Sequence, residues 1–279
     1  MPAKRGLLLM KCARIYLSED KRVSLDTYIA EDKSVVRDAM LIFPGGGYSH
    51  CSDREAEPVA LAFVSKGFNA FVLRYRVGDE DRYPDQLTDA CKALLHIKKN
   101  ASDYGICPDR VFAIGFSAGG HLAGTLATVD TRPEAYGILG VDKSELTLAG
   151  VILSYPVISA LMSTHQNSFV RLSGKPYAEL NDEERRRLSV ETHINSDSPP
   201  AFLWHTSEDA TVPVCGTLAV AQKYIDLKIP VAVRIYPYGP HGISLANKFT
   251  SGGKPELEDT VASGWVDEVC TWIDNLRKN

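Results

Sequence analysis

The sequence predicts an α/β fold, in which helices cover both faces of a mainly parallel, twisted sheet. Short apolar runs alternate with longer stretches whose apolar residues recur at helical spacing, and glycine or proline separates many of them. The 279 residues are enough to bury a large core without a disulfide or a structural metal. A content of 44% hydrophobic and 24% charged residues is ordinary for a globular protein.

The predicted elements follow one another along the chain. Residues 11–30 alternate apolar and polar side chains in places, which favours an antiparallel strand pair at the sheet edge. Apolar runs predict further strands over 38–43, 68–73, 110–115, 148–154, 200–205 and 231–236. Apolar residues at helical spacing predict helices over 54–66, from Pro84 onward, and over 118–128, 214–227 and 260–276.

Residues 157–198 interrupt this alternation, since they hold no convincing apolar strand but do hold a charged, helix-like run. Right-handed crossovers place the functional loops at the carboxyl ends of the strands. An insertion after a strand would lie over that edge as a small lid. We find no internal repeat and no linker, so we predict one domain over residues 1–279 with this insertion inside it.

Charge and cysteine usage exclude several classes of protein. A net charge of −4 gives no electrostatic reason to bind nucleic acid or an anionic membrane. The apolar run 6–10 breaks at Lys11 and is too short for a signal peptide. The six cysteines show neither CxxC nor zinc-ligand spacing, which favours free thiols in a reducing cytosol. We therefore expect a cytoplasmic protein with no metal and no organic cofactor.

Gly115-Phe-Ser117-Ala-Gly119 is a G-x-S-x-G motif between an apolar strand and a helix rich in small residues. In this setting the serine occupies a sharp turn, and the glycines remove side chains that would clash there. The N–H groups at the start of the helix favour developing negative charge. The motif predicts Ser117 as a nucleophile; the alternative is a tight turn with an unreactive serine.

A serine nucleophile needs a general base, and the base needs an orienting acid. Where this motif acts, the chain order is serine, acid, histidine. Glu208 and Asp209 follow the strand 200–205, and His241 follows the strand 231–236. This order favours His241 as the base, and either carboxylate fits the acid.

The other histidines fit less well. We predict His205, which precedes the acid, to be a packed or hydrogen-bonded structural residue, and His121 to support the turn at Ser117. The histidines that follow the wrong order, lie in the insertion or lie on a long helix are His50, His96, His165 and His193.

The glycines after Pro44 follow an early strand, where their N–H groups can face an oxyanion without an intervening Cβ. We predict an oxyanion hole formed by Gly46, Gly47 and Ala118. A phosphate-binding loop is the alternative, but the third glycine of G-x-G-x-x-G and the G-K-[ST] sequence are missing.

Over nearly its whole length the chain resembles the α/β-hydrolases that are acetyl-xylan-esterase-like or feruloyl-esterase-like carbohydrate esterases. The stretches that carry the resemblance are Pro44-Gly-Gly-Gly-Tyr-Ser-His50, Asp53-Arg-Glu-Ala-Glu-Pro58, Phe71-Val-Leu-Arg-Tyr-Arg76, Gly115-Phe-Ser-Ala-Gly-Gly-His121, Pro199-Pro-Ala-Phe-Leu-Trp-His-Thr206 and Gly239-Pro-His-Gly242. Pro44 stands where lipases have the leading histidine of H-G-G-G.

The resemblance implies an α/β-hydrolase fold with Asp209, the second carboxylate of its pair, as the acid. It also implies a serine esterase that removes small acyl groups, chiefly acetyl, from sugar hydroxyls such as those of xylo-oligosaccharides. The partner is then a small-molecule ester, through an acyl-enzyme on Ser117. Tyr48, with Tyr75 and Tyr155, is a candidate for binding the sugar, and ordinary core is the alternative for all three.

Two other functions remain open at this point. An amidase or peptidase, including a formamidase, would use the same three residues on the same fold. A non-catalytic member that binds a ligand is the other alternative, and the complete set of nucleophile, acid and base argues against it.

Overall fold

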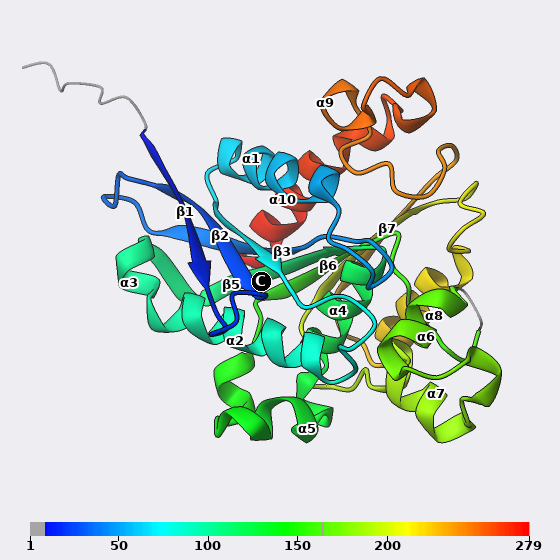
Figure 1. The fold of residues 1–279 in the computed structure, drawn as a ribbon. Helices are drawn as coiled ribbons and strands as arrows, with labels where there is room; N and C mark the ends of the chain where they lie inside the picture. Colours follow the sequence, from blue (N-terminus) through cyan, green and yellow to red (C-terminus); the bar gives the residue numbers. More distant parts are fainter. Residues whose placement is uncertain (1–8, 163–164, 279) are drawn as a thin grey trace, which may run out of the picture.

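The computed structural model describes residues 9–162 and 165–278, so residues 6–8 of the N-terminal apolar run lie outside the described part. The described residues form an eight-stranded sheet with the order β1-β2-β4-β3-β5-β6-β7-β8 (Figure 1). The pairs β1–β2 and β2–β4 are antiparallel, and all other neighbours are parallel. The strands are β1 (Met10–Tyr16), β2 (Ser24–Ala30), β3 (Arg37–Phe43), β4 (Asn69–Arg74), β5 (Ile106–Phe116), β6 (Gly150–Ser154), β7 (Ala201–Thr206) and β8 (Val231–Tyr236).

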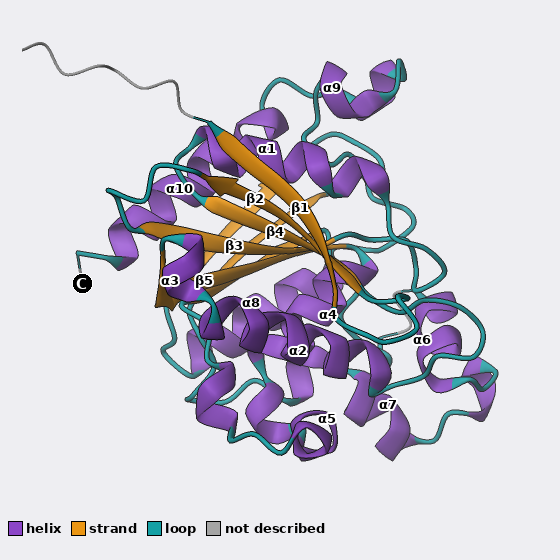
Figure 2. Cartoon of the chain, turned by 60° about the vertical axis from the view of Figure 1, so that its left-hand side comes forward, coloured by secondary structure: helices purple, strands orange, loops and turns teal. Residues whose placement is uncertain are grey.

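Helices cover both faces of the sheet, as Figure 2 shows. The apolar side chains of α1 and α10 pack on one face, and those of α2, α4 and α8 pack on the other. The helices are α1 (Glu57–Ser65), α2 (Asp85–Lys99), α3 (Ala101–Tyr104), α4 (Ala118–Ala127), α5 (Pro133–Tyr136), α6 (Gln166–Ser173), α7 (Asp182–Leu188), α8 (Cys215–Asp226), α9 (Lys248–Ser251) and α10 (Trp265–Leu276). The predicted α/β fold is confirmed.

Burial explains why the strands could be recognised. The residues of β6 and β7 are buried throughout, because parallel strands covered on both faces require continuous apolar runs. β1 lies at the sheet edge and is almost entirely exposed, so it lacks the continuous apolar run of the central strands. β5 begins at Ile106, four residues before its apolar run, because Ile106 pairs with Arg37 ahead of a register shift.

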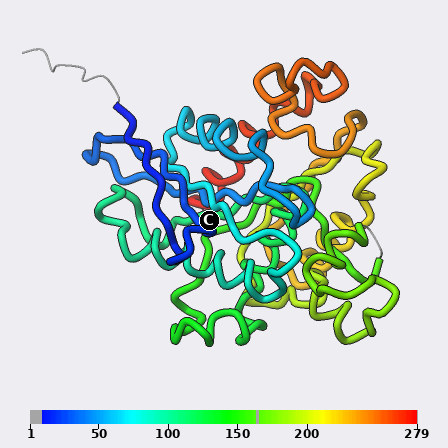
Figure 3. The backbone as a smooth tube through the Cα atoms, in the orientation of Figure 1, coloured from blue at the N-terminus to red at the C-terminus, as the bar shows by residue number. Residues whose placement is uncertain are grey.

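Residues 157–198 leave the sheet after β6 and return at β7. Figure 3 shows them as a green to yellow-green lobe, which contains α6 and α7. Within the segment the chain returns on itself, since the Val190 N–H donates to the Ile158 carbonyl at 3.1 Å. The Ala160 N–H also donates to the Ser189 hydroxyl at 2.9 Å. That the segment acts as a lid stays a prediction, as does the assignment of the chain to one domain.

Within the described ranges, no helix combines the length and the apolar character that crossing a membrane requires. The six cysteines are free thiols, and Cys91 alone among them is buried.

Candidate active site

Ser117 stands between β5 and α4 with φ 54° and ψ −118°, in the left-handed region that side chains rarely adopt. The glycines around it allow this turn. A Cβ on Gly115 would lie 2.0 Å from the Gly119 carbonyl oxygen, and one on Gly119 would lie 2.1 Å from the Phe43 carbonyl oxygen. The strained turn thus packs directly against the end of β3.

Gly119→Ala tests this packing. The added methyl would meet two backbone carbonyls, at 2.1 Å and 2.5 Å, so the strand end or the helix has to move. We expect the free energy of unfolding to fall by about 3 kcal/mol or more, which is at the upper end of the usual effect of adding a group to a well-packed core. Urea titration measures this loss. Gly137→Ala is the matched control, because a Cβ there meets nothing within 4 Å; equal stability of the two variants would contradict the prediction.

The structure brings Ser117, His241 and Asp209 together. The His241 Nε2 lies 2.7 Å from the Ser117 Oγ, and its Nδ1 lies 2.6 Å from the Asp209 Oδ2. The loops after β5, β7 and β8 supply the three residues from the same edge of the sheet. Glu208 has a different partner, since its Oε2 accepts from the Gly239 N–H at 3.2 Å.

Asp209 is held as an anion by its neighbours. The Thr211 and Val212 N–H groups donate to its Oδ1 at 3.0 Å and 2.8 Å. Its burial opposes ionisation, but the hydrogen bonds from His205, His241 and Val212 outweigh it and hold the pKa of Asp209 well below its usual range. The carboxylate is therefore a permanent acceptor for the His241 ring.

His205 is buried and hydrogen-bonded, as predicted. Its Nε2 lies 2.8 Å from the Val212 carbonyl oxygen, so this nitrogen carries the proton. The same nitrogen lies 3.1 Å from the Asp209 Oδ2. Its Nδ1 then accepts from the Thr217 hydroxyl at 2.8 Å. The contact between His205 and Asp209 is one that sequence reasoning missed.

The glycine loop after β3 adopts backbone conformations that favour glycine, with φ 126° at Gly46 and 61° at Gly47. A Cβ on Gly46 would lie 2.1 Å from the His50 carbonyl oxygen. Gly46 and Gly47 line the same cleft as Ser117 and His241, and Ala118 is the first residue of α4. That their N–H groups form an oxyanion hole stays a prediction.

The cleft over Ser117 has a volume of about 740 Å³. Its described lining is polar, apart from glycines and the aliphatic Val170, and includes no phenylalanine, tyrosine or tryptophan. One wall comes from α6, which contributes Asn167, Val170 and Arg171, and His165 lies just before that helix. We predicted the insertion as a whole to lie over this edge, but no single residue of it as part of the site.

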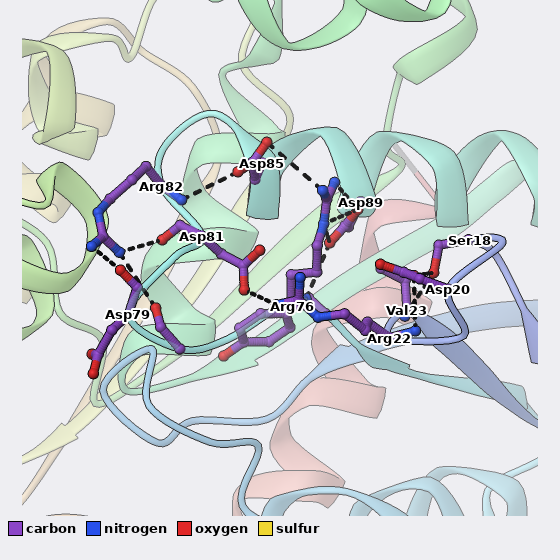
Figure 4. A network of polar contacts seen from close by, with 12 residues as sticks. Ser18, Asp20, Arg22, Val23, Arg76, Asp79, Asp81, Arg82, Asp85 and Asp89 are labelled. Carbon is purple, nitrogen blue, oxygen red and sulfur yellow. Dashed lines mark hydrogen bonds and ion pairs between the residues drawn. The ribbon is translucent and has the colours of Figure 1, made fainter.

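The adjoining part of the lining is the loop between β4 and α2, which brings Asp79 and Arg82 to the cleft and contacts α6 through the Asp79–Arg171 ion pair at 2.8 Å. Figure 4 shows how this loop is anchored. Arg76 pairs with the buried Asp89 at 2.7 Å, and Arg22 pairs with Asp81. Ion pairs on both sides of the loop therefore fix the wall to α2 and to the turn between β1 and β2.

The three tyrosines belong to the core. Tyr48 is 1% exposed, and its hydroxyl lies 2.7 Å from the His121 Nδ1. The Tyr75 hydroxyl donates to the Pro44 carbonyl at 2.6 Å, and the Tyr155 hydroxyl donates to Glu55 at 2.7 Å. This burial corrects the prediction that Tyr48 binds substrate, because its side chain supports the glycine loop from behind.

His121 connects Tyr48 to the insertion, residues 157–198. Its Nε2 lies 2.6 Å from the Leu188 carbonyl oxygen and must carry the proton, so Nδ1 accepts from Tyr48. Complete burial lowers the pKa of His121 to about 4. Burial also lowers the pKa of His193 to about 4.

These depressed pKa values predict acid lability. The unfolded chain binds protons at His121 near pH 6.5 and the folded chain only near pH 4, so stability is complete above 6.5 and falls between these values. At pH 4 we expect the difference in proton binding at His121 to lower the free energy of unfolding by up to roughly 3 kcal/mol. Urea unfolding at pH 7 and pH 4.5 measures the slope. His121→Gln should reduce this dependence of stability on pH and leave only the part that comes from His193. An equally steep dependence in the variant would contradict the assignment.

The chain matches the model of the BD-FAE family over residues 25–224. It is 39% identical over 250 residues to endo-1,4-beta-xylanase B of Butyrivibrio fibrisolvens, covering 85% of this chain and 38% of that protein. The chain spans 38% to 53% of the length of the first curated relatives that it matches.

Two solved structures match along almost their whole length. MGS-M1, an alpha/beta hydrolase from a Medee basin deep-sea metagenome library, is 33% identical with a TM-score of 0.78, covering 98% of this chain and 100% of that one. The acetyl ester-xyloside bifunctional hydrolase of Caldicellulosiruptor lactoaceticus is 30% identical with a TM-score of 0.81, covering 97% and 98%. These comparisons confirm the resemblance seen in the motifs, and the chain belongs to the BD-FAE family and has the α/β-hydrolase fold.

Proposed function

We propose that the chain is a serine carboxylic ester hydrolase that removes small acyl groups, chiefly acetyl, from sugar hydroxyls. The observation that carries the proposal is a pair of contacts: Ser117 lies 2.7 Å from His241, and His241 lies 2.6 Å from Asp209. A hydroxyl this close to an imidazole nitrogen can lose its proton as it attacks a carbonyl.

In the proposed reaction, the neutral Nε2 of His241 takes the Ser117 proton while the Oγ bonds to the acyl carbon. The N–H groups of Gly46, Gly47 and Ala118 stabilise the oxyanion of the tetrahedral intermediate. The imidazolium then protonates the departing sugar oxygen and leaves an acyl-enzyme. Water attacks the acyl-enzyme with the same base, which releases the acid and restores Ser117. Asp209 stays ionised and stabilises the imidazolium.

The character of the cleft supports a small, polar substrate. Hydrogen-bonding side chains from α6 and from the β4–α2 loop face Ser117, and a sugar offers several hydroxyls to such groups. Long acyl chains would find only Val170 as an aliphatic neighbour among the described lining residues. The name of the Caldicellulosiruptor lactoaceticus relative, an acetyl ester-xyloside hydrolase, also supports acetyl removal.

The test is a substrate panel on the purified protein. We expect acetate release from acetylated xylobiose and from p-nitrophenyl acetate, and covalent labelling by a fluorophosphonate probe. Aryl amides and formyl-kynurenine should be cleaved far more slowly. Faster cleavage of an amide would instead establish an amidase, and a wild-type protein that fails to label would remove the basis for a serine hydrolase.

A further inference from the structure

The oxyanion loop (residues 44–50) and the base loop (residues 237–246) belong to distant strands. The first follows β3 and the second follows β8, with β5, β6 and β7 between them in the sheet. Neighbouring strands lie about 4.8 Å apart, so no backbone ladder joins the two loops directly. Their relative position must depend on side chains that cross the site.

Glu55 makes this crossing. It lies in the short turn η1 (Asp53–Glu55) and is 5% exposed. Its Oε2 accepts from the Gly45 N–H of the oxyanion loop at 2.8 Å. Its Oε1 accepts from the Tyr155 hydroxyl at 2.7 Å, and that hydroxyl in turn accepts from the Ser244 N–H of the base loop at 3.0 Å.

The rest of the turn strengthens the same connection. The Arg54 guanidinium donates to the Gly242 carbonyl, next to His241, at 3.0 Å, and also to the Thr250 carbonyl. The Ser244 hydroxyl donates to the Arg54 carbonyl at 2.7 Å. Ser52, just before the turn, donates from its N–H to the Gly45 carbonyl at 3.0 Å. The turn is thus bonded to both loops.

We infer that Glu55 is a positioning residue that fixes the oxyanion loop relative to the base loop, an inference that rests on the proposed function. Holding the Gly45 N–H sets the direction of the next two peptides, whose N–H groups are the proposed oxyanion donors. The Tyr155 ring meets the His241 ring edge-on, with centroids 5.2 Å apart. Both hydrogen bonds to Glu55 come from donors, the Gly45 N–H and the Tyr155 hydroxyl, so a carboxylate suits the position.

The first test compares Glu55→Gln with Glu57→Gln, an exposed control two residues along the chain. Glu55→Gln should lower kcat by about 10- to 100-fold with KM nearly unchanged, since it disturbs donors that act in the transition state. Glu57→Gln should change neither kcat nor KM. Equal kcat values in the two variants, or a change in KM alone for Glu55→Gln, would overturn the inference.

The second test does not need activity. In Glu55→Ala, amide hydrogen exchange should accelerate in both loops and stay unchanged in the central strands; if that variant does not fold, Glu55→Gln is used. Acceleration in the oxyanion loop alone, or in neither loop, would overturn the inference. If the wild type neither labels nor hydrolyses esters, the proposed function fails, while the exchange pattern still decides whether Glu55 joins the loops.

Discussion

Replacing Ser117 with alanine is expected to lower kcat for ester hydrolysis by about 10⁶-fold. The substitution keeps the backbone and the Cβ and removes only the Oγ, which lies 2.7 Å from the His241 Nε2. The backbone bond from the Ser117 N–H to the Ser154 carbonyl, at 3.0 Å, is retained. We therefore expect the free energy of unfolding to change by less than about 1 kcal/mol. Single-turnover kinetics and urea titration measure the two effects.

Ser154→Ala is the matched control for this variant. Ser154 is buried, as Ser117 is, and it is the last residue of the central strand β6. Its hydroxyl, however, has no hydrogen-bond partner among the described residues. We expect the control to turn over substrate and to label with a fluorophosphonate at rates close to those of the wild type. If Ser117→Ala labels as well as Ser154→Ala does, the nucleophile lies elsewhere.

Asp209→Asn should lower kcat by about 10⁴-fold, the second largest effect that we expect. The Oδ2 of Asp209 accepts from both His241 and His205, at 2.6 Å and 3.1 Å. An amide nitrogen at this position would face two donors. His241 could then accept at Nδ1 only with its proton on Nε2, where it can no longer take the Ser117 proton.

Glu208→Gln is the control that separates the two carboxylates. Glu208 accepts from the Gly239 N–H, and the two ring nitrogens of His241 contact Asp209 and Ser117 instead. The loss of Glu208 should therefore change kcat by less than about threefold, as expected for a substitution outside the reacting groups. A larger effect for Glu208→Gln than for Asp209→Asn would reverse the assignment of the acid. Steady-state kinetics on p-nitrophenyl acetate are sufficient for the comparison.

The sequence predicts the central strands well because burial on both faces leaves a continuous apolar run. It places their ends less well where tertiary contacts decide them. The pairing of Ile106 with Arg37 extends β5 through Pro108 and Asp109, which carry no strand signal of their own. Similarly, the predicted helix 260–276 begins only at Trp265, after a 3-10 turn over Ala262–Gly264.

The site residues also divide into those that the sequence predicts and those that tertiary contacts decide. Ser117 and His241 could be singled out because each follows a strand and the chain order is informative. Spacing alone left Glu208 and Asp209 equal, since which carboxylate turns toward His241 depends on the Asp209 contacts with Thr211 and Val212. The roles of Glu55 and His205 depend on contacts between loops that are far apart in the sequence, and no local pattern signals them.

The contact between Ile158 and Val190 bears on how this α/β-hydrolase scaffold can diversify. The part of the insertion between these two residues begins and ends at neighbouring points, tied by the bond between Val190 and Ile158. The entropy of closing such a loop grows only slowly with its length. Insertions, deletions or whole exchanges between these points can therefore arise in evolution without moving Ser117 or His241. Since α6 forms one wall of the cleft, such exchanges would remodel substrate choice while the chemistry is inherited intact.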